Sequence, residues 1–297
     1  MNTCVIGGCN VDFIIKCDNE KICPGTSNVS STNVNAGGVG RNIAVNMHRM
    51  GCNVTFITSC GSDYLSHYIE DDLKQNDINS LIIRKGNTGI YAAVLKKSGI
   101  LNTAFCDMKS TESISAFEIL KSGADFKSFD GVVIDANLNK DTIRDLCSYF
   151  KDKAIPYALE SVSNEKCIRI KDSLKGCTFI KPNRYEAEIL TGQACSTFEE
   201  VKKCARILST GGVKNVIISL GSEGFYYYDG KTSLCEKPLK SKIADVTGAG
   251  DSMFAAAFTG ILKGLKPSDI CKAANKCAAL TCRSYSSVSN EITSEIF

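Results

Sequence analysis

The chain has 297 residues, of which 43% are hydrophobic and 23% charged, and its 35 basic and 32 acidic side chains give a net charge of +3. A chain of this length and composition can bury a core without disulfides or metals, as one large α/β domain or two smaller ones. The near balance of charge gives no electrostatic case for nucleic acid or a membrane surface as a partner.

Sixteen cysteines are scattered singly between Cys4 and Cys282, with no Cys-x-x-Cys pair and only two histidines in the sequence. This spacing does not support a structural zinc site. The first residues are typical of a strand rather than a signal peptide, and no run approaches the ~20 apolar residues of a membrane span. We therefore expect a reducing, cytoplasmic compartment in which most cysteines are small core residues.

Short apolar runs bounded by turn residues alternate with amphipathic stretches, which predicts strands alternating with helices. This alternation is typical of right-handed crossovers and a mostly parallel sheet with helices on both faces. The predicted strands are Thr3–Cys9, Val54–Cys60, Gly131–Ala136, Pro156–Leu159, Thr178–Lys181 and Val216–Leu220. The predicted helices are Val39–Met50, Asp63–Gln75, Lys140–Phe150, Tyr185–Thr191 and Glu199–Leu208.

Two stretches, residues 12–35 and 88–105, interrupt the alternation. Apolar and polar residues alternate in both, turn residues such as Pro24-Gly25 and Ser98-Gly99 divide them, and neither has a helical face. They predict antiparallel strands outside the main sheet. Such a small sheet could be a lid that covers a cleft and excludes water. It could equally be an ordinary hairpin excursion, and the periodicity leaves both interpretations open.

A glycine-rich block at residues 35–44, Asn-Ala-Gly-Gly-Val-Gly-Arg-Asn-Ile-Ala, introduces the predicted helix at Val39. It lacks the dinucleotide-binding spacing, because Ile43 occupies the place of the third glycine and no clean parallel strand precedes it. Its glycines would let a ligand hydroxyl approach the backbone, and Asn42 would point toward that ligand. The alternative is a tight turn with a capping role.

A second glycine-rich block, Asp-Val-Thr-Gly-Ala-Gly-Asp-Ser-Met at residues 245–253, precedes a small apolar run. Its Gly-Ala-Gly turn would leave N–H groups free at a helix start, where they and the helix dipole stabilise an anion. Asp251 would lie in the first turn, beside that anion. The alternative is an acid that only stabilises the helix end. The chain has no P-loop motif and no nucleophile elbow.

Together these motifs resemble the ribokinase-like (PfkB) family of sugar and nucleoside kinases. Residues 35–44 resemble its N-terminal signature and residues 245–251 its C-terminal signature. Asn183-Arg184-Tyr185-Glu186 resembles its Asn-x-x-Glu motif, and residues 219–224 resemble its nucleotide-binding turn. The motifs occur in the family's order across the whole chain. The resemblance implies one ribokinase-like kinase domain over residues 1–297, a three-layer α/β/α fold with a mostly parallel central sheet and a small antiparallel β lid.

The resemblance implies ATP as the phosphoryl donor, Mg²⁺, and K⁺ as an activating ion. Asp251 would take the proton of a primary hydroxyl, while the N–H groups of Gly248, Ala249 and Gly250 would hold the transferring phosphoryl group. Glu186 would hold Mg²⁺ through water, and Asp245 and Thr247 would form the K⁺ loop. The implied acceptor-binding residues are Asp12, Gly37, Gly38, Asn42 and Lys166, although Lys166 could simply face solvent. The implied ATP-binding residues are Asn183, Ser219, Gly221, Gly224 and Asn275.

Within the family, residues 37–44, 106–108 and 181–188 resemble those of pseudouridine kinases. The implied reaction is phosphorylation of the 5′-hydroxyl of pseudouridine. Glu160 stands where the resemblance would place an Asp-Pro pair. This difference concerns the pocket that recognises the base and not the residues for phosphoryl transfer. The alternatives are ribokinase, adenosine or inosine kinase, and fructose-type kinase activity, or a non-catalytic nucleotide or sugar sensor. The expected partner is a small molecule, with a possible homodimer through the lid.

Overall fold

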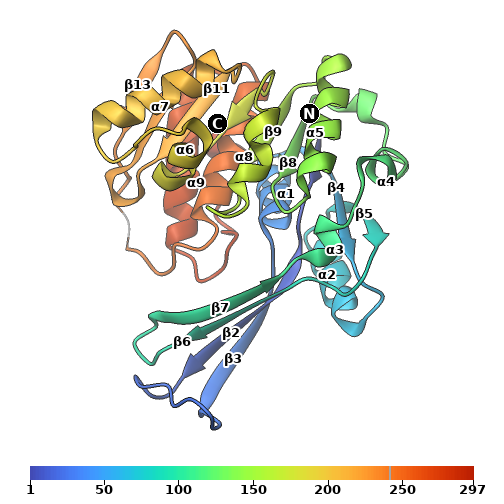
Figure 1. The fold of residues 1–297 in the computed structure, drawn as a ribbon, viewed down its shortest axis with the longest axis vertical. Helices are drawn as coiled ribbons and strands as arrows, with labels where there is room; N and C mark the ends of the chain where they lie inside the picture. The colour runs from blue at the N-terminus through green and yellow to red at the C-terminus, as the bar shows by residue number, and fades with distance from the viewer. Residues whose placement is uncertain (241) are drawn as a thin grey trace.

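The computed structural model describes residues 1–240 and 242–297, which form a nine-stranded and a four-stranded sheet (Figure 1). The larger sheet has the order β13-β12-β11-β10-β9-β8-β1-β4-β5. Its strands pair in parallel from β5 to β11, and β12 and β13 continue the sheet antiparallel. The predicted mostly parallel central sheet is confirmed. Its strands are β1 (Asn2–Ile6), β4 (Asn53–Cys60), β5 (Asn79–Arg84), β8 (Gly131–Asp135), β9 (Tyr157–Glu160), β10 (Phe179–Ile180), β11 (Asn215–Ser219), β12 (Phe225–Tyr228) and β13 (Ser233–Glu236).

Helices cover both faces of this sheet, because successive strand side chains point to opposite sides. In β1, Val5 belongs to the core under α1, α2, α8 and α9, while Cys4 and Ile6 belong to the core under α4, α5, α6 and α7. The predicted three-layer arrangement is thereby confirmed. The helices are α1 (Val39–Arg49), α2 (Tyr64–Gln75), α3 (Lys109–Glu112), α4 (Ala116–Leu120), α5 (Lys140–Asp152), α6 (Arg184–Thr191), α7 (Phe198–Thr210), α8 (Ala249–Leu262) and α9 (Pro267–Cys282), with 3-10 turns η1 (Phe126–Ser128), η2 (Cys167–Ser173), η3 (Gly221–Glu223) and η4 (Ser294–Ile296).

Helix α8 is anchored in the core by its apolar residues. Phe254 and Phe258 are fully buried, and the ring of Phe254 lies 5.0 Å from that of Phe179 on β10. Burial of a phenylalanine side chain contributes about 1.5–3 kcal/mol. This packing holds the N-terminus of α8 in a defined place relative to the ends of the central strands.

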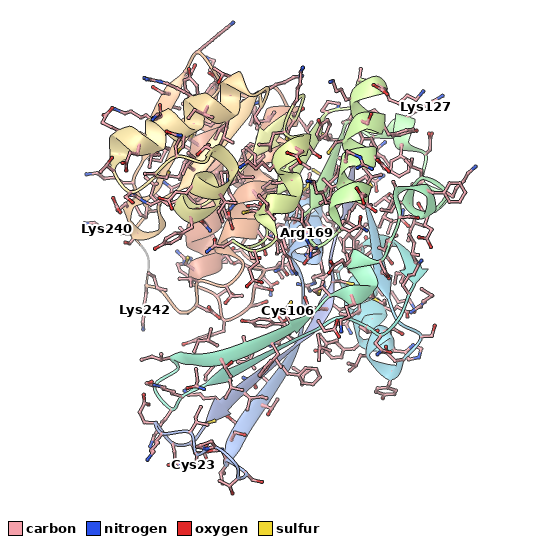
Figure 2. All side chains as sticks on the ribbon, in the orientation of Figure 1. Cys23, Cys106, Lys127, Arg169, Lys240 and Lys242 are labelled. Atoms are coloured by element: carbon pink, nitrogen blue, oxygen red, sulfur yellow. The ribbon has the colours of Figure 1, made fainter. Side chains whose placement is uncertain are left out.

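The four-stranded sheet has the order β3-β2-β6-β7 and consists of two antiparallel hairpins joined by a parallel β2–β6 pair. It extends away from the central sheet and its helices (Figure 1). Cys23 lies at its far end and Cys106 closer to the rest of the molecule (Figure 2). The strands confirm that residues 12–35 and 88–105 form a separate small sheet. They are β2 (Asn10–Cys17), β3 (Ser30–Gly37), β6 (Ile90–Leu95) and β7 (Leu101–Asp107).

The first predicted strand is longer than the observed one. Thr3–Cys9 ends at Ile6, and Gly7-Gly8-Cys9 leaves the sheet. A Cβ on Gly7 would lie 2.3 Å from Oδ2 of Asp135, so only glycine leaves room for that carboxylate here. This exit places Gly8 beside the start of α1, where the candidate site begins.

The sixteen cysteines are all free and twelve of them are buried, as expected for small core residues. Across residues 1–240 and 242–297, we find no helix with both the length and the apolar character to cross a membrane.

Candidate active site

The glycine-rich turn before α8 has the geometry of an anion site. Gly248 caps the helix with a left-handed backbone (φ 79°), and a Cβ there would lie 2.0 Å from the carbonyl oxygen of Ser287, so only glycine fits. The N–H of Ala249 donates to the carbonyl of Val246 at 3.2 Å. Within the described chain, the N–H groups of Gly248 and Gly250 have no acceptor. Two of the three predicted oxyanion donors therefore remain free at the positive end of α8.

Asp251 lies in the first turn of α8, next to these donors. Its Oδ2 accepts a 2.8 Å hydrogen bond from Nδ2 of Asn42 on α1. Burial raises the pKa of Asp251 to about 6, although the Asn42 bond and the charge of Lys181 act in the opposite direction. A carboxylate with this pKa is mostly ionised at neutral pH and basic enough to accept a proton in a transition state.

Lys181, which follows β10, is a site residue that sequence reasoning missed. The residue is 6% exposed, and its Nζ lies 3.4 Å from where a Cβ on Gly250 would be. Its charge lowers the pKa of both Asp251 and Glu160. A buried cation beside free N–H groups favours a polyanion such as a nucleotide phosphate. A lysine directly after a buried apolar strand was the signal that could have revealed it.

Glu160, at the end of β9, is a buried acid beside this group. Its Oε2 has no hydrogen-bond partner among the residues described. Burial raises the pKa of Glu160 to about 8, and the neighbouring charges of Glu186 and Asp251 act in the same direction. Glu160 is therefore mostly protonated at neutral pH and adds little negative charge near Asp251.

Asn183 and Glu186 form a capping box at the start of α6. Oδ1 of Asn183 accepts from the N–H of Glu186 at 3.0 Å, and Oε2 of Glu186 accepts from the N–H of Asn183 at 2.9 Å. The hydroxyl of Ser161 donates to the same Oε2 at 2.7 Å. Glu186 is 5% exposed, and its Oε1 is without a partner in the described structure. The pair thus has a structural role and still offers one carboxylate oxygen to a water or cation.

The predicted ATP-binding residues lie at the ends of neighbouring strands. Asn183 forms a parallel bridge with Ser219, which ends β11. Gly221 begins η3 and Gly224 follows it, before β12. The amide of Asn275 on α9 is bonded at both ends, to the carbonyl of Lys237 at 2.7 Å and the N–H of Leu239 at 3.3 Å. Asn275 thus holds the segment after β13, and its place near adenine stays a prediction.

The predicted acceptor residues gather at the start of α1. Gly38 caps α1 with φ 102°, and a Cβ there would lie 2.5 Å from the carbonyl oxygen of Gly8. Gly37 lies against the carboxylate of Asp12, with 2.3 Å between Oδ2 and a Cβ on Gly37. Asn10 donates to Asp12. Burial raises the pKa of Asp12 to about 6, opposed by Asn10 and by the charge of Arg41.

Tyr91 is a second residue that the sequence did not reveal. The strand register places it directly opposite Asp12, with Asn35 on the other side of Asp12 and Cys106 beyond Tyr91. Residues in one such row share a face of the sheet. Partial burial raises the pKa of Tyr91, and the charge of Asp12 acts in the same direction. The face that carries Asp12 therefore presents an aromatic ring beside it.

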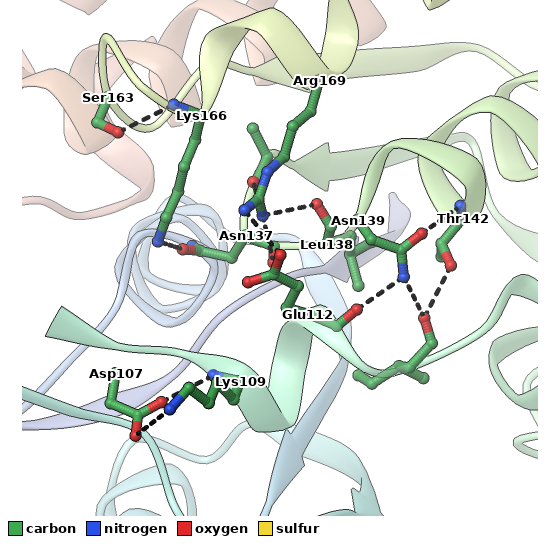
Figure 3. Close-up of polar contacts among 12 residues, drawn as sticks. Asp107, Lys109, Glu112, Asn137, Leu138, Asn139, Thr142, Ser163, Lys166 and Arg169 are labelled. Atoms are coloured by element: carbon green, nitrogen blue, oxygen red, sulfur yellow. Dashed lines mark hydrogen bonds and ion pairs between the residues drawn. The ribbon is translucent and has the colours of Figure 1, made fainter.

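Lys166 belongs to a polar network around the loop after β8 (Figure 3). Its Nζ donates to Oδ1 of Asn137 at 2.7 Å, and Nδ2 of Asn137 donates to Oδ2 of Asp135 at 3.1 Å. The same oxygen accepts from the N–H of Gly8 at 2.9 Å. Lys166 is therefore connected to Gly8, next to the cap of α1, and is not a freely solvated lysine.

Arg169 fixes the backbone of the loop that carries Asn137. Its guanidinium donates to the carbonyls of Ala136, Asn137 and Leu138 at 3.2–3.3 Å and forms a 2.9 Å ion pair with Glu112 (Figure 3). It holds the loop after β8 in place.

Two donors of the Lys166 ammonium remain for a ligand, because Asn137 takes one of its three.

In the predicted cation loop, Asp245 and Thr247 are hydrogen-bonded to each other. The N–H and the hydroxyl of Thr247 both donate to Oδ1 of Asp245, at 2.9 and 2.8 Å. Across residues 1–240 and 242–297, no group of three His, Cys, Asp or Glu side chains is arranged to hold a metal. Any ion at this loop would therefore depend on backbone carbonyls and water as well as on Asp245.

A family model described as pfkB family carbohydrate kinase matches residues 2–293. Pseudouridine kinase of Escherichia coli (strain K12) is 30% identical over 286 residues, which cover 94% of this chain and 90% of that protein. The crystal structure of a putative sugar kinase from Clostridium perfringens has a TM-score of 0.83 at 30% identity, covering 98% of this chain and 92% of that one. Arabidopsis thaliana ribokinase complexed with ribose and ATP has a TM-score of 0.83 at 19% identity, covering 99% and 96%.

Proposed function

The chain belongs to the pfkB family of carbohydrate kinases, and on this premise we propose that it transfers the γ-phosphoryl group of ATP to the 5′-hydroxyl of pseudouridine. The observation that carries the proposal is the position of Asp251. Asp251 lies next to the free N–H of Gly250, and its carboxylate accepts a hydrogen bond from Asn42, which belongs to the acceptor site. A base in this place meets both the attacking hydroxyl and the phosphoryl group.

Asp251, mostly ionised at neutral pH, accepts the proton of the 5′-hydroxyl as its oxygen bonds to the γ-phosphorus, while the bond from that phosphorus to ADP breaks and ADP leaves. The N–H groups of Gly248 and Gly250 and the ammonium of Lys181 stabilise the charge on the transferring phosphoryl oxygens. The N–H of Ala249 is bonded to Val246, so Ala249 stabilises the phosphoryl oxygens only as part of the positive end of α8.

The nucleotide lies along the ends of β10 and β11. Ser219, Gly221 and Gly224 line its phosphates and ribose, with Asn275 near the adenine. Mg²⁺, when bound, neutralises phosphate charge. The free Oε1 of Glu186 fits a water of its hydration shell, and the Asn183 cap fixes that carboxylate.

Asp12 accepts hydrogen bonds from two ribose hydroxyls, Gly37 and Gly38 allow close backbone approach, and Asn42 completes the ribose site. Tyr91 provides an apolar surface for the base. The free donors of Lys166 bond to a base carbonyl, which favours a uracil ring over adenine. The relative at 30% identity named pseudouridine kinase supports this choice of acceptor.

The four-stranded sheet closes over the acceptor as a lid on the single kinase domain of residues 1–297. Val34, Phe13, Ala92 and Phe105 form one row on its other face, and Val34 and Phe105 are 40% and 66% exposed. This apolar row is the surface through which two copies pair. The free cysteines fit a reducing cytoplasm.

K⁺ binds at the loop of Asp245 and Thr247 and raises activity, because this loop leads into the turn of Gly248. Replacing Na⁺ with K⁺ at constant ionic strength should therefore increase the rate. Equal rates in both salts would remove K⁺ from the proposal.

The test of the proposal is ADP release with pseudouridine, uridine, adenosine, ribose and fructose under identical ATP, Mg²⁺ and K⁺ concentrations. Pseudouridine should give the highest kcat/KM. A higher kcat/KM for ribose or adenosine would refute pseudouridine as the acceptor, although the protein would still be a kinase. No turnover with any acceptor, together with ATP-dependent thermal stabilisation, would indicate a nucleotide sensor instead.

A further inference from the structure

The side-chain amide of Asn42 is held in one orientation by two donors. Its Oδ1 accepts from Nη1 of Arg41 at 3.2 Å and from the hydroxyl of Ser287 at 3.1 Å. Its Nδ2 is thereby left to face Asp251. If the amide turned over, its NH₂ group would face the Arg41 donor and its oxygen would face a carboxylate. Both contacts would be repulsive, so the surroundings determine which end meets Asp251.

Arg41 is itself held by Asp72 on α2. Nε donates to Oδ2 at 2.8 Å and Nη2 to Oδ1 at 2.6 Å, a two-point ion pair. The side chains of Arg41 and Asp72 are 5% and 19% exposed. Such a charge-assisted pair fixes the plane of a guanidinium. The third arm of Arg41, Nη1, then points at Asn42.

We propose that Arg41 and Asp72 are positioning residues that fix the Asn42 amide so that it stabilises the ionised form of Asp251. The proposal rests on the function proposed above, in which Asp251 is the base. Neither Arg41 nor Asp72 touches the reacting atoms. The chain of contacts runs from α2 through α1 to α8, and Asp72, its first member, lies outside the family motifs quoted above.

Other charged groups surround this chain and remain unchanged in the test below. Lys181 and Asp135 act on Asp251 from the ends of two central strands, and the charge of Asp251 in turn raises the pKa of Glu160 at the end of a third. Arg49, Asp12 and the Cys9 thiol are the ionisable groups around Arg41. An effect of Arg41 on Asp12 would appear in the KM of the acceptor, whereas an effect through Asn42 appears in the pH dependence of turnover.

A hydrogen bond to the ionised form of an acid lowers its pKa. When the two-point ion pair is broken, Arg41 no longer fixes the Asn42 amide, and Asp251 loses much of that bond. Its pKa then rises, and a larger fraction of the enzyme is protonated and inactive at low pH. The acid limb of the pH–kcat profile, measured at saturating acceptor, should move to higher pH, while the plateau at high pH stays close to wild type.

Asp72→Asn is the variant to compare, and Glu70→Gln is its matched control. Glu70 lies on the same helix, and its carboxylate pairs with Arg84 at 2.6 Å, but both side chains are more than one-third exposed. Asp72→Asn should move the acid limb up by about one pH unit, and Glu70→Gln should leave it in place. In an Asn42→Ala background, Asp72→Asn should cause no further shift.

A profile of Asp72→Asn that overlays wild type would overturn the proposal, and so would an equal shift in the Asn42→Ala background. If Asp72→Asn fails to fold, Ser287→Ala removes the other donor to the Asn42 amide without a charge change, and its acid limb should move in the same direction. Full activity of Asp251→Asn would instead refute the proposed base. The two failures are therefore distinguishable.

Discussion

Asn42 and Asp251 are 209 residues apart in the chain, and the amide of the first donates a 2.8 Å hydrogen bond to the carboxylate of the second. The bond joins the N-terminal ends of α1 and α8, the helices that follow the two glycine-rich blocks. The residues expected to hold the acceptor and those expected to hold the phosphoryl group thus meet at one carboxylate. This meeting point, rather than either motif alone, supports a transfer reaction.

Lys181→Met should lower kcat by about 10²–10³-fold, the loss typical of one donor to a developing anion. The reason is the position of Nζ beside Gly250. Lys276→Met, on the exposed side of α9, removes an equal charge and should leave kcat unchanged. Steady-state kinetics at saturating ATP and acceptor compare the two, and equal effects would mean that Lys181 acts only through net charge.

Glu186→Gln should raise the Mg²⁺ concentration needed for half-maximal activity. Glu200→Gln is a matched control, because Glu200 closes a capping box at the same position of α7. Both changes weaken a helix cap by a similar amount. A Mg²⁺ titration of the two variants separates the roles. If they respond alike, Glu186 serves its helix and not the metal.

Glu160→Gln should change how stability depends on pH. The pKa of Glu160 is about 8 in the folded chain against an ordinary 4.5, so the folded state binds the additional proton between these values. The free energy of unfolding therefore falls as pH rises through this window, by up to about 1.4 kcal/mol per pH unit. Because glutamine does not titrate, the Glu160→Gln variant should not lose this part of its free energy of unfolding as the pH rises.

The measurement is Tm at pH 5 and pH 8 for wild type, Glu160→Gln and the exposed control Glu165→Gln. Wild type and the control should lose more stability between these pH values than Glu160→Gln. Parallel losses in all three would show that Glu160 is already ionised in the folded protein.

Lys166→Met should raise the KM for pseudouridine by about 10- to 100-fold, since a hydrogen bond from a charged donor to the base is lost. The KM for ATP should not change. Lys171→Met removes a lysine from the neighbouring turn, where Nζ bonds to the carbonyl of Ile189 at 3.0 Å. A KM for pseudouridine that rises equally in both variants would indicate a local distortion instead of base recognition.

Much of the central sheet could be predicted from sequence, because buried parallel strands and amphipathic helices have distinct periodicities. The strands β5, β12 and β13, the short helices α3 and α4 and the helix α9 were missed. In β12 the run Phe225–Tyr228 has no alternation, and α9 is rich in small residues that give a weak apolar stripe. Their structures are determined by tertiary packing more than by local pattern.

The glycine-rich turns and Asp251 were found because their residue order is informative in itself. Tyr91 and Asn137 were not found, since each acts through neighbours distant in the chain, whereas the position of Lys181 after a buried strand was a signal that was overlooked. Tyr91 is beside Asp12 only through the register of β2 and β6. Asn137 is significant only because Lys166 donates to it from 29 residues away. No linear spacing encodes such pairs.

The most direct test of the account is the turnover of Asp251→Asn beside that of Asp269→Asn. Asp269 is also an acid in the first turn of its helix, α9, where its exposed carboxylate lies 3.8 Å from Nζ of Lys272 on the same helix. Asp251→Asn should lose about 10²–10⁴-fold in kcat while ATP and acceptor still bind, and Asp269→Asn should keep wild-type kcat. Wild-type turnover in a folded Asp251→Asn protein would contradict the assignment of Asp251 as the base.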